Sequence, residues 1–198
     1  MNLAKVQFSE EEFAIVQNAA LLLTKNRVIE KVRQTFLGLS QELKQLYLDN
    51  LDGYPPALVG CQPGITKGEK LKGLPWVVLD YPRHFDRENI LALRTIFWWG
   101  HDVIITLHLK GSYLPRGIAA INQYRALLEA NHFVLCTSGD EWEHALDTVH
   151  VIPLKGTASL EAASFVKLSV TIPLDTWNET LQDKLAEIHL IFATLIKD

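Results

Sequence analysis

The most constraining feature of this sequence is a pair of predicted β-strands whose two faces differ. In DVIITLHLK (102–110) and FVKLSVTIPL (165–174), alternate side chains make one face apolar and the other half polar. Strands of a parallel sheet, which helices cover on both sides, are instead apolar nearly throughout. The pattern therefore favours a sheet with helices on one face and a partly open second face. The second face would carry Ile104, Thr106, His108, Lys110, Phe165, Lys167, Ser169 and Thr171.

The other segments alternate between helical and strand-like patterns. Residues 1–50 predict two amphipathic helices, the first begun by a capping box of Ser9 and Glu12. Further strands are predicted over 76–81, 132–137 and 148–154. Further helices are predicted over 86–97, 116–131, 139–147, 157–164 and from residue 175 or 176 to the C-terminus. We therefore predict an α+β fold with a single mixed β-sheet of about five strands and helices mainly on one face. A doubly wound α/β sheet is the alternative.

The domain organisation follows from length and from a change of composition near residue 52. A chain of 198 residues suits one domain spanning 1–198. Residues 1–50 would form a helical N-terminal part, and residues 76–198 an α/β core. Between them, residues 52–75 are rich in proline and glycine and predict a long loop, of a length that is usually functional or mobile.

Composition excludes several classes of partner. The formal net charge of −4 gives no general electrostatic attraction for nucleic acid, whose phosphates must be neutralised on binding. The two cysteines, Cys61 and Cys136, do not form a disulfide framework. The N-terminus has no signal-peptide pattern, and no apolar run approaches the ~20 residues needed to span a bilayer. We expect a soluble cytoplasmic protein that binds neither nucleic acid nor membrane.

The sequence also lacks the strong motifs of cofactor and metal sites. It contains no G-x-G-x-x-G, H-E-x-x-H, paired C-x-x-C or G-x-S-x-G, so no cofactor is predicted. On a helix, the segment DEWEHALDTVH would place Asp140, His144 and Asp147 on one face, with His150 following, and such ligands suit zinc or manganese. Acidic residues are favoured at a helix N-terminus by the helix dipole alone. We therefore predict no metal site there.

Candidate catalytic residues lie at the end of the strand predicted over 76–81 and within the strand over 102–110. Asp80 and His84 belong to the first group, and His108 lies deeper in the second strand. If the two strands are neighbours, Asp80 could orient the His108 ring, which is what a general base near neutral pH requires. No serine or cysteine with evident partners completes a nucleophilic set.

Candidate ligand-binding residues surround the same region. Arg83 could hold an anionic group by a forked contact. Trp98 and Trp99, followed by His101, could form the wall of a pocket. Tryptophans at such a junction are equally typical of core packing or of a pocket rim. These four residues are therefore candidates for binding, and packing at the junction remains the alternative.

Three functions remain open from the sequence. The first is a binding domain that holds a protein partner or a small ligand near the Trp98–His108 region. The second is a small hydrolase or transferase that uses an Asp80/His108 acid–base pair. The third is a structural self-associating module. The C-terminal segment LAEIHLIFATLI is apolar over more than one stripe, so it needs cover on two sides, from the N-terminal helices or from a second subunit. A homodimer is therefore predicted.

The run LPWVVLDYPRHFDRENILALRTIFWWGHDVIITLHLKGSY, residues 74–113, resembles an uncharacterised family of conserved hypothetical proteins of bacteria. The resemblance covers about a fifth of the chain. It implies a bacterial protein, but it implies no activity and assigns no site residue.

Overall fold

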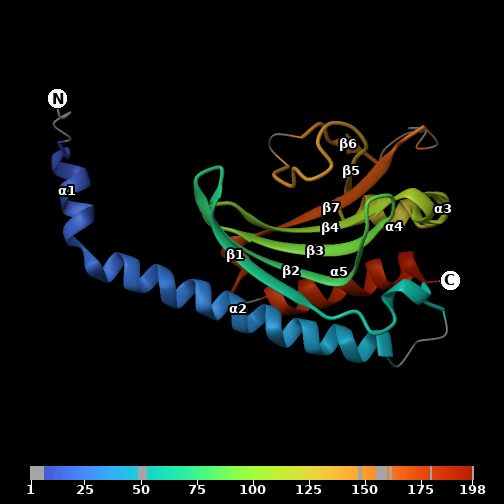
Figure 1. Ribbon diagram of the computed structural model, residues 1–198, viewed down its shortest axis with the longest axis horizontal. Coiled ribbons are helices and arrows are strands. Elements are labelled where there is room, and N and C mark those ends of the chain that lie inside the picture. Colours follow the sequence, from blue (N-terminus) through green and yellow to red (C-terminus); the bar gives the residue numbers. More distant parts are fainter. Residues whose placement is uncertain are drawn as a thin grey trace.

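A single antiparallel sheet forms the centre of the protein (Figure 1). The computed structural model describes residues 7–48, 53–146, 149–154, 160, 162–178 and 180–197. Within these residues seven strands lie in the order β1-β2-β3-β4-β7-β5-β6. They are β1 (Gly64–Leu71), β2 (Leu74–Phe85), β3 (Ile90–Trp98), β4 (Asp102–Lys110), β5 (Val134–Cys136), β6 (Ile152–Pro153) and β7 (Phe165–Pro173).

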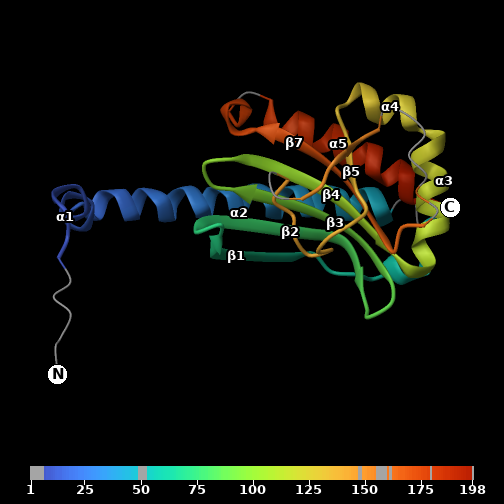
Figure 2. The same cartoon turned by 90° about the horizontal axis from the view of Figure 1, so that it is seen from above.

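The helices lie mainly on one face of this sheet and at its end (Figures 1 and 2). The two longest, α2 and α5, cover one face, and α3 and α4 lie at one end. The α-helices are α1 (Glu10–Gln17), α2 (Ala19–Leu48), α3 (Leu114–Gln123), α4 (Arg125–Ala130) and α5 (Leu181–Ile196). Single 3-10 turns are η1 (Pro56–Leu58), η2 (Gly111–Tyr113) and η3 (Leu174–Thr176). None of the helices, over the described residues, is long and apolar enough to cross a membrane.

The α+β class is confirmed, but two details of the predicted sheet are wrong. Over the described residues the sheet has seven strands rather than about five. Every strand pair in the described residues is antiparallel, so the sheet is not mixed and the doubly wound alternative is excluded. The segments 86–97 and 139–147 were predicted as helices between strands, but residues 90–98 form β3 and residues 139–146 form turns. Without such helices the neighbouring strands are joined by turns, and this makes them antiparallel.

The predicted helix over 86–97 is instead strand β3. Asp86 accepts hydrogen bonds from the backbone N–H groups of Glu88 and Asn89, at 2.8 and 2.5 Å, and so shapes the β2–β3 turn. An aspartate at a helix N-cap accepts bonds from the same kind of N–H groups, so the local sequence signal is the same for both. The residues that follow, ILALRTIFW, are buried except for Arg94, as in a central strand.

The predicted loop over 52–75 contains edge strand β1. Two glycines in this segment are typical of a loop, but in the structure each leaves room for the side chain of another residue. A Cβ atom at Gly68 would lie 2.5 Å from the Trp76 ring, and one at Gly64 would lie 2.6 Å from the Arg83 guanidinium. The strand also exposes Lys67, a charge that discourages pairing with another edge.

The remaining helix predictions are confirmed in part. Ser9 and Glu12 form the predicted capping box. The first two helices are separated at Asn18, and α2 then continues from Ala19 to Leu48. Residues 139–146 form turns rather than a helix. Of the helix predicted over 157–164, residues 157–159 and 161 lie outside the described residues, and residues 160 and 162–164 are not helical. The last helix begins at Leu181, after the 3-10 turn η3.

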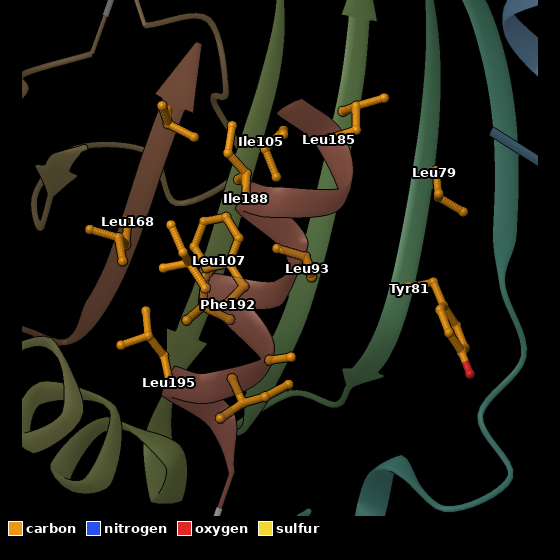
Figure 3. Close-up of a cluster of buried hydrophobic side chains, with 14 of the residues drawn as sticks. Leu79, Tyr81, Leu93, Ile105, Leu107, Leu168, Leu185, Ile188, Phe192 and Leu195 are labelled. Atoms are coloured by element: carbon orange, nitrogen blue, oxygen red, sulfur yellow. The ribbon is translucent and has the colours of Figure 1, made fainter. Parts of the chain in front are cut away.

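The main core lies between the sheet and helices α2 and α5. Figure 3 shows the part of it that lies between α5 and the sheet. Phe36 of α2 and Phe192 of α5 are each 0 % exposed. His189 of α5 is also fully buried, and its Nε2 lies 3.0 Å from Thr95 Oγ1 of β3. Helix α5 is covered by the sheet, α2 and α3 of its own chain, and of its large hydrophobic side chains only Leu190 is exposed. The apolar side chains around most of α5 are therefore buried within its own chain, and they need no second subunit to cover them.

Candidate functional site

The face of the sheet opposite the helices is closed by a segment of the same chain, residues 137–146. Beneath this segment His108 and Lys167 are each 2 % exposed. The Lys167 ammonium donates hydrogen bonds to the backbone carbonyls of Asp140, at 3.4 Å, and Glu143. A buried cation thus attaches the segment to β7. The expectation of a partly open face needs correction here, since its polar side chains are covered.

Asp80 forms a two-point ion pair with Arg94 under this cover. Arg94 Nε and Nη2 donate to the two carboxylate oxygens of Asp80 at 2.7 and 3.0 Å. Arg94 Nη1 lies 2.9 Å from His144 Nε2, which must accept because a guanidinium can only donate. Burial, followed by the charge of Arg94, lowers the pKa of His144 to about 2. His144 is therefore a neutral acceptor.

The predicted Asp80–His108 pair is not formed. Strand β3 lies between β2 and β4, so that Asp80 faces Arg94 and His108 faces Ala92. His108 Nε2 is instead 3.8 Å from Glu141 Oε2, beyond hydrogen-bond distance. Burial lowers the pKa of His108 to about 4, against the opposing effect of Glu141. The ring is a neutral buried group without the carboxylate partner that a general base needs.

The other two candidates at the end of β2 hold local structure. His84 Nε2 lies 3.1 Å from the Asp86 carboxylate in the β2–β3 hairpin. Arg83 Nε donates to the Gln62 carbonyl at 3.0 Å, and its guanidinium lies over Gly64. The sequence predicted Arg83 as an anion-binding residue, whereas the structure places it against edge strand β1.

The two adjacent tryptophans lie on opposite faces of the sheet. Trp98 is buried on the covered face, where its indole N–H donates to the Leu71 carbonyl at 3.2 Å. The exposed His101 ring stacks on it, with 3.5 Å between centroids. Trp99 lies on the helix side, where its ring contacts Phe97 at 6.3 Å between centroids. Of the predicted ligand-binding residues, only Trp99 lines a cavity on the helix side.

A cavity of about 350 Å³ opens beside Trp99, and we call it the Trp99 hollow. It lies where α2, the β3–β4 turn and η3 meet, and most of its lining is apolar. Trp177 contributes a second indole, with its centroid 5.5 Å from that of Phe97. Sequence reasoning missed Trp177, although its position just after strand β7 could have indicated it. The hollow is lined by Val28, Lys31, Val32, Phe97, Trp99, Gly100, Leu174, Trp177 and Asn178.

The second unpredicted feature is an arm made of residues 7–24, which contacts little of the body. Figures 1 and 2 show α1 and the first turns of α2 projecting beyond the edge of the sheet. Every residue from 7 to 24 is exposed. The three consecutive leucines at 21–23, which cannot all lie on one face of a helix, are the sequence signal of this wide apolar surface. The exposed large side chains are Phe8, Phe13, Ile15, Val16, Leu21, Leu22 and Leu23, each 50–63 % exposed.

The four residues considered for metal binding do not gather. Asp140 and His150 are exposed, His144 is buried against Arg94, and Asp147 lies outside the described residues. Over the part of the chain that the structure describes, no group of three or more His, Cys, Asp or Glu side chains could hold a metal ion.

Comparison with known proteins adds no family. No family model, curated protein or solved structure matches this chain. Its function must therefore be inferred from the arm, the Trp99 hollow and the covered sheet face themselves.

Proposed function

We propose that this chain is a self-associating module, and that its arm packs against the arm of a second copy to form a homodimer. The observation that carries the proposal is the exposure of seven large apolar side chains on residues 7–24. A group of large exposed apolar side chains of this size is typical of an interaction site, because moving apolar surface out of water is favourable.

The structure of the arm also favours a partner. Leu21, Leu22 and Leu23 point around most of the helix, and a helix that is apolar on all sides requires burial. Helix α1 has only eight residues and none is buried. Helices shorter than ~12–15 residues are marginal without packing. Contact with a second molecule would supply that packing.

Charge complementarity supports a second copy as the partner. Residues 7–18 carry three glutamates and no basic residue, whereas residues 24–33 carry four basic residues and one acidic residue. Lys25 and Arg33 are paired within the chain with Glu69 and Glu30, so Arg27 and Lys31 remain to attract acidic groups. In a two-fold antiparallel pair, the acidic end of each arm lies over the basic part of the other.

Trp99 belongs to the Trp98–His108 region, which the sequence indicated as a binding region, and it also lies near the arm. The Trp99 hollow lies next to the base of the arm, so partner binding and the tryptophan junction belong to one surface. The hydrolase or transferase alternative has no comparable support, because Asp80 is paired with Arg94 and His108 lies on a strand that is not its neighbour.

Replacement of Leu22 by Gln should convert the dimer to a monomer at micromolar concentration. Glutamine keeps the helix propensity of leucine, so the change removes apolar surface without unfolding α2. Burial of one leucine contributes about 1.5–3 kcal/mol, and a symmetric dimer loses it twice, so Kd should rise at least about a hundredfold. Sedimentation equilibrium measures Kd, and circular dichroism checks the fold.

Two matched leucines serve as comparisons. Leu127 on α4 is also exposed, and Leu127→Gln should leave Kd unchanged. Leu190 is the exposed leucine of α5, so dissociation by Leu190→Gln but not by Leu22→Gln would assign the interface to the C-terminal helix and refute the arm. A monomeric wild-type protein that binds phospholipid vesicles through the arm would also contradict the proposal.

A further inference from the structure

We propose that the Trp99 hollow of each copy receives helix α1 of the other, with Phe13 inserted between Trp99 and Trp177. This inference rests on the proposed homodimer, and it assigns the hollow as the receptor of an exchanged arm. Each copy would then contribute a helix to the site of its partner.

The spacing along the arm fits this exchange. If the two-fold axis passes near Leu22, the bend at Asn18 of one copy lies four residues to one side of the axis, or ~6 Å along α2. Val28, which lines the hollow, lies six residues to the other side, or ~9 Å. The C-terminal end of α1 in one copy therefore lies within one helical turn, along the paired arms, of the partner's hollow.

The bend at Asn18 directs α1 toward the sheet. Figure 1 shows α1 rising from the end of α2 on the side where the sheet lies, rather than continuing along the α2 axis. The hollow lies on that side of α2, because the β3–β4 turn and η3 form its other walls. If the two-fold axis places both sheets on the same side of the paired arms, α1 of each copy points toward the hollow of the other copy.

The chemistry of the two surfaces also matches. Phe13 and Val16, three residues apart on α1, share one face and are 51 % and 63 % exposed. The hollow offers apolar walls that include two indole rings, and aromatic side chains pair favourably with such rings. Lys31 on its rim would lie beside the acidic first turn of α1, residues 10–12. Apolar side chains would enter the hollow while charges of opposite sign meet outside it.

The test is photo-crosslinking from the position of Phe13. In one sample p-benzoylphenylalanine replaces Phe13. This sample is mixed with nitrogen-15-labelled protein that keeps Phe13, so that crosslinks between copies are recognised by their mass. We expect crosslinks between copies to peptides of the hollow, residues 28–32, 97–100 and 174–178. The same probe in place of Ile15, about 200° around α1 from Phe13, is the matched control and should not label these peptides.

The outcomes separate this inference from the proposed dimer. A dimer whose Phe13 probe labels the partner's arm or another surface would overturn the hollow as receptor and leave self-association intact. A monomer that gives no link between copies would overturn both. Phe13→Ala should also raise the dimer Kd at least about a hundredfold, because both copies lose a buried aromatic side chain. An unchanged Kd would contradict the insertion of Phe13, and because Phe13 is exposed in the single chain, this variant should fold normally.

Discussion

Arg94→Met should lower the free energy of unfolding by about 3–5 kcal/mol, which is the usual cost of leaving one charge of a buried pair alone. Arg94 makes two hydrogen bonds to the carboxylate of Asp80, which is 7 % exposed, and a third contact to His144 Nε2. Methionine fills similar space but supplies none of these donors. Urea unfolding of the variant measures the change.

Two variants distinguish the buried pair from a general effect of losing arginine. Arg33→Met removes a pair with Glu30 in which both side chains are about half exposed, and it should cost less than about 1 kcal/mol. Asp80→Leu combined with Arg94→Met removes both buried charges and should recover most of the stability. If Arg94→Met costs no more than Arg33→Met, the covered sheet face does not depend on this pair.

The protein should lose stability steeply as the pH falls below 6.5, because three buried histidines are neutral in the folded state. Burial lowers the pKa of His108 to about 4, that of His144 to about 2 and that of His189 to about 3. In the unfolded chain these histidines bind protons near pH 6.5, whereas in the folded chain they do not. The free energy of unfolding that they contribute is therefore fully present above pH 6.5 and decreases as the pH falls below it.

The expected loss is large relative to the stability of a single domain. Each histidine contributes about 1.4 kcal/mol per pH unit, or about 2.7 kcal/mol at pH 4.5, and three together approach a domain's total of about 5–15 kcal/mol. Urea unfolding at a series of pH values measures the slope. His189→Gln, which keeps a polar atom near Thr95, should reduce the slope by about a third, whereas His132→Asn at an exposed turn should not change it. An identical slope in all three proteins would show that these buried histidines do not control acid stability.

The sequence predicted strand β4 with the bounds that the structure has, because its alternation of apolar and polar side chains has only one interpretation. It failed at β3, where Asp86 gives the same signal for a helix cap and for a hairpin turn. That single error changed the strand order. It made β2 and β4 appear to be neighbours and led to a catalytic pair of Asp80 and His108 that does not form.

The arm and the Trp99 hollow show a different limit of sequence reasoning. Periodic apolar residues such as Phe13 and Val16 predict a helix correctly, but the period does not reveal which surface covers it. The hollow depends on Val28, Trp99 and Trp177, which are far apart in the sequence and meet only because α2, the β3–β4 turn and η3 converge. The leucines at 21–23 and the position of Trp177 are only partial signals, and the surfaces they belong to become visible only in the tertiary structure.

Hydrogen exchange of the arm amides tests the central claim of self-association most directly. In a single chain the arm consists of α1 and the uncovered first turns of α2, and its amides should exchange nearly as fast as those of a frayed peptide. The dimer predicts slow exchange across residues 19–24 at protein concentrations above Kd, and faster exchange after dilution below it. Fast exchange of these amides at every concentration, with the body of the protein remaining protected, would contradict the proposal that the arm binds a second copy.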